Sequence, residues 1–536
     1  MARNRIIYAS QSVWCNGEVL YRVSSLGSTT TFTSEDIFEL GHLDIVDVVD
    51  DVPAVAVTLN TMDWGDVYTM ALLAQVPPAK RTMDSTVTPT TANLEVVDSY
   101  GAHFDNSTTG SGYYHGVGVP DFAITCGNLP GISMWAPVQD ECSLGTLADN
   151  IDQTMWMDEV FINSLEFSYT TGANATENYG GETDQKAWFL NDGRFINFES
   201  FTLSGTETTV SLEGVVTDSV TIATLSDGDL GFLRKDENGS PAISIYDASA
   251  DEMMNYAIAA GAATATTAGY AAGVITLPTG FTAAAGDRVE VIYAADGYAS
   301  SVSQKYFEIL DSVDRPDTVG AMRQGHVEVY IVDPDDGALT SWADAVAFRL
   351  TNCTITADLT REPLTELGHL GPYDRPLTLP IPLTVTMDTT AGDLEHWARW
   401  AGVLDEYLAN TRTDINLATL FGNENMKLVV KLYAQTDEEA GGTGVARKIL
   451  GPDNPLIGQS YWLHGEEMTY AQNDQEYPMK TIIVEHLKIT DEAYTLDLGA
   501  NATQTFGFRS TNDLYVVKGE VKFDDVKSYR IRRNQL

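Results

Sequence analysis

The pentapeptide Glu-Leu-Gly-His-Leu occurs twice in this chain, at Glu39–Leu43 and again at Glu366–Leu370. A second pentapeptide, Gly-Ala-Asn-Ala-Thr, occurs at Gly172–Thr176 and again at Gly499–Thr503. Both pairs have the same offset in residue number, 327, which we call the repeat offset. Two identical pentapeptides at one offset are very improbable by chance. The sequence therefore predicts a tandem duplication of a domain of about 200 residues, with additional sequence between the copies.

The repeats divide the chain into three predicted domains. Because 536 residues exceed what a single core organises, we assign residues 1–200 to the first copy, 201–300 to an inserted domain and 301–536 to the second copy. Most periodic segments have strand character. The best helix candidates are Asp66–Ala74 and Asp393–Ala401, where an Asp in the capping position precedes an apolar face.

The inserted segment differs in composition from the two copies. It is rich in Gly, Ala and Thr, and short apolar runs alternate with Gly and Asp turns. This arrangement is typical of a small β-sandwich. The predicted fold class is therefore mainly β: two tandem barrel or sandwich domains, each with one packed α-helix, plus an inserted small β-sandwich.

The charge balance is extreme, with 76 acidic and 31 basic residues and a net charge of −45. Dense carboxylates keep a protein hydrated in concentrated salt, where the Debye length is about 3 Å at 1 M. This favours a halophilic origin, and the alternative is a very acidic protein from ordinary conditions. A protein that binds nucleic acid or an anionic membrane is disfavoured, because such binding needs Lys and Arg to contact phosphate groups. We expect the basic residues to gather at contacts between subunits.

No motif for catalysis, cofactor binding or metal binding survives inspection. The nucleophile elbow, the zinc-peptidase helix, the P-loop and the dinucleotide fingerprint are all missing from the sequence. Four cysteines, Cys15, Cys126, Cys142 and Cys353, lack metal-site spacing and are predicted to be buried thiols, with a Cys126–Cys142 disulfide as the alternative. We predict a non-enzymatic protein without cofactor or metal, without a signal peptide and without a membrane-spanning segment.

Two further local predictions concern the segments around the two Glu-Leu-Gly-His-Leu pentapeptides. Asp44–Val49 and Ala54–Leu59 are expected to form a hairpin turned at Asp50–Pro53. Long hairpin loops are expected over about Ser25–Phe38 and Ala357–Thr365. In the first of them the run Ser28–Thr31 is small and polar, which suits it to becoming ordered on contact with a partner.

Two stretches resemble the tail tube proteins of tailed bacterial and archaeal viruses. One is Arg361–Pro376 with the following strand Leu377–Thr386, and the other is Ile37–Leu43 with Val55–Thr58. In that family a strand, a long loop and a Glu-Leu-Gly turn lead into a second strand pair, followed by a short helix. The turn positions that carry the resemblance are Glu39, Gly41, His42, Glu366, Gly368 and His369. The resemblance covers both copies and leaves out residues 201–298.

The resemblance implies a structural virion protein. Most tube proteins carry one such domain, and a duplicated one resembles the subset whose rings are homotrimers with pseudo-hexameric symmetry. Stacked rings would form the hollow tail tube, assembled in the host cytoplasm, through which viral DNA passes without specific binding. Expected partners are other copies of this chain, the tape measure protein and the tail terminator and baseplate proteins. The ring-stacking candidates on the long loops are Leu26, Thr30, Phe32, Leu359 and Arg361.

Two other classes stay open from the residues alone. One is a cell-surface or adhesin-like structural protein of a halophile, or another component of a virion tail. The other is a polysaccharide-acting tail enzyme, although so long a repeat offset is unlike the short repeat of a β-helix.

Overall fold

A computed structural model gives the structure of the chain. It describes residues 11–62, 67–74, 103–104, 116–124, 132–139, 151–190, 194–212, 221–222, 231–296, 326–334, 339–390, 409, 426–433, 450, 457–496, 502–528 and 531–532, with short gaps inside several of these ranges.

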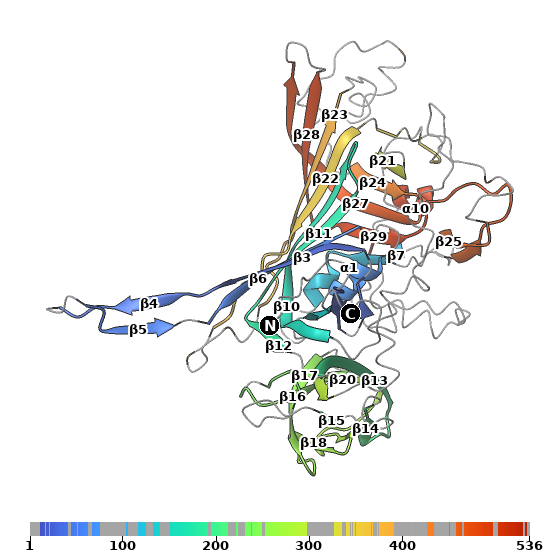
Figure 1. Ribbon diagram of the computed structural model, residues 1–536. Helices are drawn as coiled ribbons and strands as arrows, with labels where there is room; N and C mark the ends of the chain where they lie inside the picture. The colour runs from blue at the N-terminus through green and yellow to red at the C-terminus, as the bar shows by residue number, and fades with distance from the viewer. Residues whose placement is uncertain are drawn as a thin grey trace.

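The protein is mainly β, as predicted, and its largest sheet, of sixteen strands, is nearly closed and barrel-like (Figure 1). Its central part is antiparallel and has the order β3-β6-β11-β10-β22-β23-β28-β27. The eight strands are β3 (Val23–Thr31), β6 (Ala54–Thr61), β10 (Ile151–Thr170), β11 (Thr176–Thr183), β22 (Leu350–Asp358), β23 (Pro382–Thr389), β27 (Lys480–Thr495) and β28 (Thr503–Thr511).

The two longest strands, β10 and β27, extend beyond this central sheet and organise smaller flanking sheets. The beginning of β10 pairs with β9 and β12, and β9 continues to β1 and β2. The beginning of β27 pairs with β24 and β29, which continue to β21 and β8. These strands are β1 (Trp14–Cys15), β2 (Glu18–Val19), β8 (Gly116–Gly118), β9 (Ile132–Gln139), β12 (Gln185–Leu190), β21 (Val327–Val332), β24 (Met426–Leu432) and β29 (Leu514–Lys518).

Alternation of side chains fixes which face of the central sheet is buried. In β6 the residues Val55, Val57 and Leu59 are buried, whereas the residues between them are exposed or partly exposed. The same period of two runs through β22 and β23. The buried apolar residues of these strands belong to one cluster, so one core lies against one face of the sheet and the other face is polar.

Helices are few and short among the described residues. The helix α1 (Tyr68–Leu73) packs its Met70–Leu73 segment into the core, which confirms the central part of the helix predicted at Asp66–Ala74. The other helices are α4 (Asp121–Ile124) and α10 (Phe523–Ser528). The helix predicted at Asp393–Ala401 lies outside the described residues. Within the described part of the chain, no helix combines the length and apolarity needed to cross a membrane.

The inserted segment is a compact β-unit below the main sheet in Figure 1. Its strands form one eight-stranded sheet, which differs from the two stacked sheets of the predicted sandwich. Residues from both ends of this sheet, Ile196 and Leu212, share one core with Trp14, Trp135 and Trp156 of the main unit. The strands are β13 (Arg194–Ser204), β14 (Thr209–Ser211), β15 (Thr221–Ile222), β16 (Ala242–Asp247), β17 (Glu252–Ala260), β18 (Thr267–Ala271), β19 (Val274–Thr276) and β20 (Ala285–Asp296).

A two-stranded arm projects from the main sheet (Figure 1). It consists of β4 (Ser34–Ile37) paired with β5 (Asp47–Asp50). The predicted hairpin between Asp44–Val49 and Ala54–Leu59 is therefore wrong, because β6 alternates buried and exposed residues and pairs with β3 and β11 in the wall of the main sheet. Two more small pairs complete the described strands: β25 (Ser460–Leu463) with β26 (Glu466–Thr469), and β7 (His103–Phe104) with β30 (Ile531–Arg532).

Candidate assembly interface

The two parts of the central sheet meet where β10 pairs with β22, a junction that we call the seam. Residues 164–170 of β10 run antiparallel to residues 352–358 of β22. Phe167 is opposite Ile355 and Leu165 is opposite Ala357, and all four side chains are fully buried. The seam therefore joins strands from distant parts of the sequence into one continuous wall, although consecutive strands are the more usual neighbours in a sheet.

The pairing pattern on one side of the seam recurs on the other. The first group has the order β3-β6-β11-β10, and the second group has the order β22-β23-β28-β27. Leu165 pairs with Tyr179 in the first group, and Glu492 pairs with Phe506 in the second, each at the repeat offset. Register shifts also recur at that offset. They occur between Ile162 and Ser164 and between Ile489 and Asp491, and again between Val23 and Ser25 and between Leu350 and Asn352.

Buried polar contacts recur in the same places. The Thr183 hydroxyl donates to the carbonyl of Asp158, and the Ser510 hydroxyl donates to the carbonyl of Glu485. Each of these buried carboxylates faces a cation: Asp158 lies 3.3 Å from Arg234 of the inserted unit, and Glu485 lies 2.8 Å from Lys427. Burial raises the pKa of Glu485, against the lowering effect of Lys427.

The residues that follow these carboxylates also share a conformation. Glu159 and His486 both have a left-handed backbone, with φ of 49° and 54°. Burial, helped by the neighbouring Asp158, raises the pKa of Glu159 to about 7. The Gln185 amide donates a hydrogen bond of 3.2 Å to Glu159.

Two edges of the central sheet carry no second partner strand among the described residues, and we call them the open edges. They are β3, which pairs only with β6, and the end of β27 over Asp491–Thr495, which pairs only with β28. Near them, Tyr494 is 59% exposed and Leu496 is 70% exposed. Their counterparts in the first group, Phe167 and Tyr169, are buried in the seam. Apolar side chains left in water beside an unpaired strand are typical of a binding surface.

The uncovered face of the central sheet is polar. Opposite the core-facing residues, the described strands present mainly Ser, Thr, Asn, Gly and Ala together with carboxylates. The basic residues Lys488 and Arg509 stand on the same face, and Arg375 pairs with Glu182 there at 2.7 Å. The carboxylates are Glu166, Glu182, Asp358, Asp388 and Asp491. Side-chain hydrogen bonds cross this face, for example from Thr505 to Asp388 at 2.6 Å and from Asn178 to Glu166 at 3.1 Å. This face is wetted and acidic.

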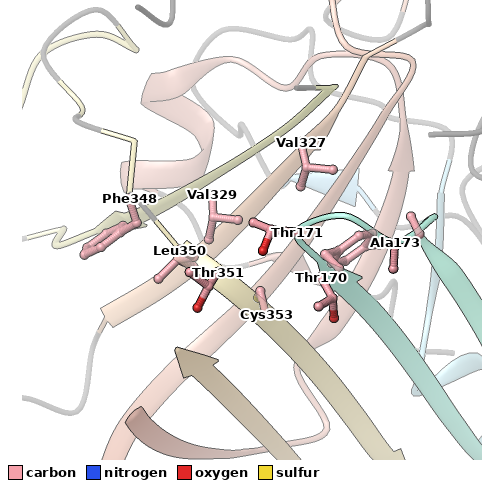
Figure 2. Close-up of a pocket in the computed structure, with 11 residues that line it drawn as sticks. Thr170, Thr171, Ala173, Val327, Val329, Phe348, Leu350, Thr351 and Cys353 are labelled. Atoms are coloured by element: carbon pink, nitrogen blue, oxygen red, sulfur yellow. The ribbon is translucent and has the colours of Figure 1, made fainter. Parts of the chain in front are cut away.

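A small cavity lies at the end of the seam. Figure 2 shows it between the end of β10, at Thr170 and Thr171, and the neighbouring Val327, Val329 and Leu350. Its volume is about 60 Å³, far below the roughly 300–1,000 Å³ of sites for drug-sized ligands. Among the described residues, the buried hydroxyl of Tyr169 beside it has no hydrogen-bond partner, and burial raises the pKa of Tyr169. The cavity can hold a few water molecules, and it gives no support for a substrate site.

Four of the five predicted ring-stacking residues are not on free loops. Leu26 and Thr30 belong to β3 because the β-branched run up to Thr31 pairs with β6 along its length. Leu359 and Arg361 are buried. Residues 359–365 lie outside the strands, in the connection between β22 and β23, so the loop predicted over Ala357–Thr365 is largely present. It is not free, because the Arg361 Nε donates to the carbonyl of Ile162 of β10 at 3.0 Å. Phe32, just beyond β3, is 79% exposed.

The turn residues of the repeated pentapeptide are mostly outside the described residues. Glu39 is exposed at the far end of the arm, whereas Gly41, His42, Glu366, Gly368 and His369 are not described. Of the cysteines, Cys15 and Cys353 are buried free thiols, as predicted, and Cys126 and Cys142 lie outside the described residues.

Several basic residues are inside the chain. Lys427, Lys431 and Lys480 are buried and pair with the carboxylates Glu485, Glu520 and Glu177. The expectation that basic residues gather at subunit contacts is wrong for these lysines, because a buried cation needs a carboxylate within reach.

One group of possible metal ligands stands out among the described residues. Glu485, His486 and Asp513 each place a ligand atom within 4.8 Å of the others. Glu485 already faces Lys427, and the Asp513 carboxylate lies 2.6 Å from His486 Nδ1. These groups have partners inside the chain, so they are explained without a metal.

Comparison with known proteins adds no identification. No protein-family model matches the chain, and no curated protein is significantly similar to it. The arrangement of strands and side chains therefore carries the functional argument. The sequence did not single out three residues at the open edges: Tyr494, Leu496 and Lys186, whose ammonium donates to the Ser28 hydroxyl of β3. Applying the repeat offset to the whole chain, and not only to its pentapeptides, would have pointed to the first two.

Proposed function

We propose that this chain is a structural protein of a viral tail, which assembles with itself into rings that stack into a hollow tube for DNA delivery. The observation that carries the proposal is the seam. It joins two groups of four strands that share one pairing pattern. Two edges stay open: β3, which corresponds to β22 of the seam, and the end of β27, which corresponds to β10.

The strand directions suit a ring. Because eight antiparallel strands make up the central sheet, the open edges β3 and β27 run in opposite directions, as β10 and β22 do at the seam. Head-to-tail contacts of this kind generate rings when the rotation closes, and closure removes exposed edges. The recurring pattern supports a duplicated tube domain. By resemblance to duplicated tube proteins, we propose three chains per ring, with each chain filling two of six equivalent places.

The polar face supports a role as a conduit. In a closed ring the core-bearing face must lie outside, against the apolar cluster, and the acidic face must line the channel. Carboxylates such as Glu166 and Asp388 repel phosphate, so the channel lacks the counterion-release energy that would retain DNA. Delivery without specific binding is the expected behaviour of such a lining.

The arm is the proposed contact between stacked rings. It presents apolar side chains to water, among them Phe38 at 68% and Leu40 at 105% of full exposure, and Val48 and Val49 near one half. An exposed apolar hairpin of this kind is suited to bind a partner. The inserted unit would decorate the outer wall, while the tape measure, terminator and baseplate proteins would act at the tube's interior and ends in the virion tail.

Electron microscopy of the purified protein across a salt series tests this function. We expect hollow tubes in molar salt that shorten into rings or single chains on dilution, because screening offsets the repulsion between chains of charge −45. A variant with residues 33–51 replaced by a short Gly-Ser turn should give rings that do not stack. Single chains at every salt concentration, or solid particles without a channel, would contradict the proposal.

A further inference from the structure

We infer that neighbouring chains join by pairing β3 of one chain with the end of β27 of another, in the register that the seam defines. This inference rests on the proposed self-assembly but not on the viral tail. Adding the repeat offset to the number of Phe167 gives Tyr494, and subtracting it from that of Ile355 gives Ser28. Since Phe167 is opposite Ile355 in the seam, Tyr494 is opposite Ser28 of the next chain.

Applying the repeat offset to every residue pair of the seam gives the register of the whole contact between chains. It places Asp491 opposite Thr31, Glu492 opposite Thr30, Ala493 opposite Thr29, Tyr494 opposite Ser28, Thr495 opposite Gly27 and Leu496 opposite Leu26. The two strands agree on which face is buried. Leu26, Ser28 and Thr30 are the core-facing residues of β3, and Glu492, Tyr494 and Leu496 are on the core side of the second group.

Exposure of apolar side chains marks the positions that this contact covers. Tyr494 and Leu496, at 59% and 70% exposed, correspond to the buried Phe167 and Tyr169. Phe32, at 79%, corresponds to Leu359, which is fully buried where its backbone N–H donates to the carbonyl of Asn163. The shifted register gives the N–H of Phe32 an equivalent acceptor, the carbonyl of Thr490 in the next chain.

A charge pair gives the contact its specificity. Lys186 of β12 reaches the edge of β3, where its ammonium donates to the Ser28 hydroxyl at 2.7 Å and lies 3.5 Å from the Thr30 hydroxyl. The register brings Glu492 of the next chain opposite Thr30. Glu492 accepts a hydrogen bond of 3.0 Å from Gln504 and keeps room for a second donor. We therefore assign Lys186 and Glu492 as an ion pair between chains.

Disulfide trapping tests the register. Thr29 and Ala493 are exposed and opposite each other in the proposed contact, so Thr29→Cys and Ala493→Cys should link under mild oxidation. Mixing the two single variants restricts linkage to one copy of each, so the expected product is a covalent dimer joined at these positions, identified by mass spectrometry. The matched control is Thr31→Cys mixed with Thr495→Cys, which the register separates by four positions and which should not link.

Charge exchange provides the second test. Glu492→Lys places two cations together and should lower the fraction of chains in rings roughly tenfold or more. Adding Lys186→Glu in the same chain should restore ring formation. Sedimentation velocity measures both effects, and unfolding in urea shows that each variant folds.

The outcomes separate this inference from the proposed function. Tubes that link through the control pair, or that form equally well with Glu492→Lys alone, overturn the register and leave the tube intact. Rings that link at 29 and 493 but never stack support the register and count against the tube. Absence of any self-association overturns both.

Discussion

The seam and the open edges are built from corresponding strands, yet their residues are in opposite environments. Phe167 and Leu359 are fully buried at the seam, whereas Tyr494 and Phe32, which stand at the corresponding places of the open edges, are 59% and 79% exposed. One chain therefore contains one completed strand contact, the seam, and two unpaired edges that correspond to the two sides of such a contact. Residues at the seam should therefore control folding, and their counterparts should control assembly.

Truncating the aromatic residue at each place should give the largest contrast. We expect Phe167→Ala to lower the free energy of unfolding by about 3–5 kcal/mol, because it leaves a cavity in the core. Tyr494→Ala should change it by less than about 0.5 kcal/mol, since its side chain is exposed in the single chain, and should abolish rings instead. Urea unfolding and sedimentation measure the two effects. Equal losses of stability in the two variants would show that the seam and the open edge do not differ in their contribution to folding.

Buried and edge lysines offer a second contrast. Lys480 of β27 pairs with Glu177 of β11 across the two groups, and both side chains are nearly fully buried. Lys480→Ala should cost about 3–5 kcal/mol because it leaves the Glu177 carboxylate buried without its cation. Lys186→Ala should cost about 1 kcal/mol or less, since that lysine donates to hydroxyl groups. Thermal or urea unfolding of the single chains measures the loss of stability in each variant. A larger loss for Lys186→Ala than for Lys480→Ala would show that the two groups fold independently of the Lys480–Glu177 pair.

Glu159, the residue with a left-handed backbone that precedes the seam in β10, should make stability depend on pH. The pKa of Glu159 is raised to about 7 by burial and then by Asp158, so folding favours its protonated form. Its contribution to stability is complete below its ordinary value of about 4.5 and is lost as the pH rises through about 7. Glu159→Gln should therefore be more stable than the natural chain by about 1 kcal/mol or less at pH 5, which is just above that ordinary value, and by roughly 1–3 kcal/mol at pH 8.

Urea midpoints of both proteins between pH 5 and pH 8 provide the measurement. His486→Gln, at the corresponding place in the second group, serves as the control for replacing a residue with a left-handed backbone there. A difference between Glu159→Gln and the natural chain that stays constant with pH would contradict the role of burial at Glu159.

Two glycines give the smallest expected contrast. A Cβ on Gly180 would lie 2.2 Å from the Ser164 hydroxyl at the seam, and one on Gly507 would lie 2.1 Å from an Asp491 oxygen at an open edge. The same Cβ on Gly180 would also lie 3.0 Å from the Asn163 Oδ1, so two side chains must move and Gly180→Ala should cost about 1–2 kcal/mol. Asp491 can turn toward solvent, so Gly507→Ala should cost less than about 1 kcal/mol. Urea unfolding measures the free energy of unfolding of both variants. A larger loss for Gly507→Ala than for Gly180→Ala would contradict the difference expected between the seam and the open edge.

The sequence by itself determined the features that depend on local pattern and on repetition. Alternating apolar residues such as Val55, Val57 and Leu59 predicted strands, the apolar stretch after Asp66 predicted α1, and the lack of metal spacing predicted that Cys15 and Cys353 are buried thiols. The pentapeptides revealed the repeat offset, at which strand pairing also recurs. These signals are readable because the period of a strand and the identity of a repeat are encoded in neighbouring residues.

Only the tertiary structure decided which strands are neighbours and which edges are open. Val48 and Val55 have equal strand propensity, yet Val48 is on the exposed arm and Val55 is in the core, because partners distant in the sequence select their faces. Arg361 looked like part of a free loop until the carbonyl of Ile162, 199 residues away, accounted for its burial. The seam, the open edges and the acidic face arise from such long-range contacts, which no local pattern specifies.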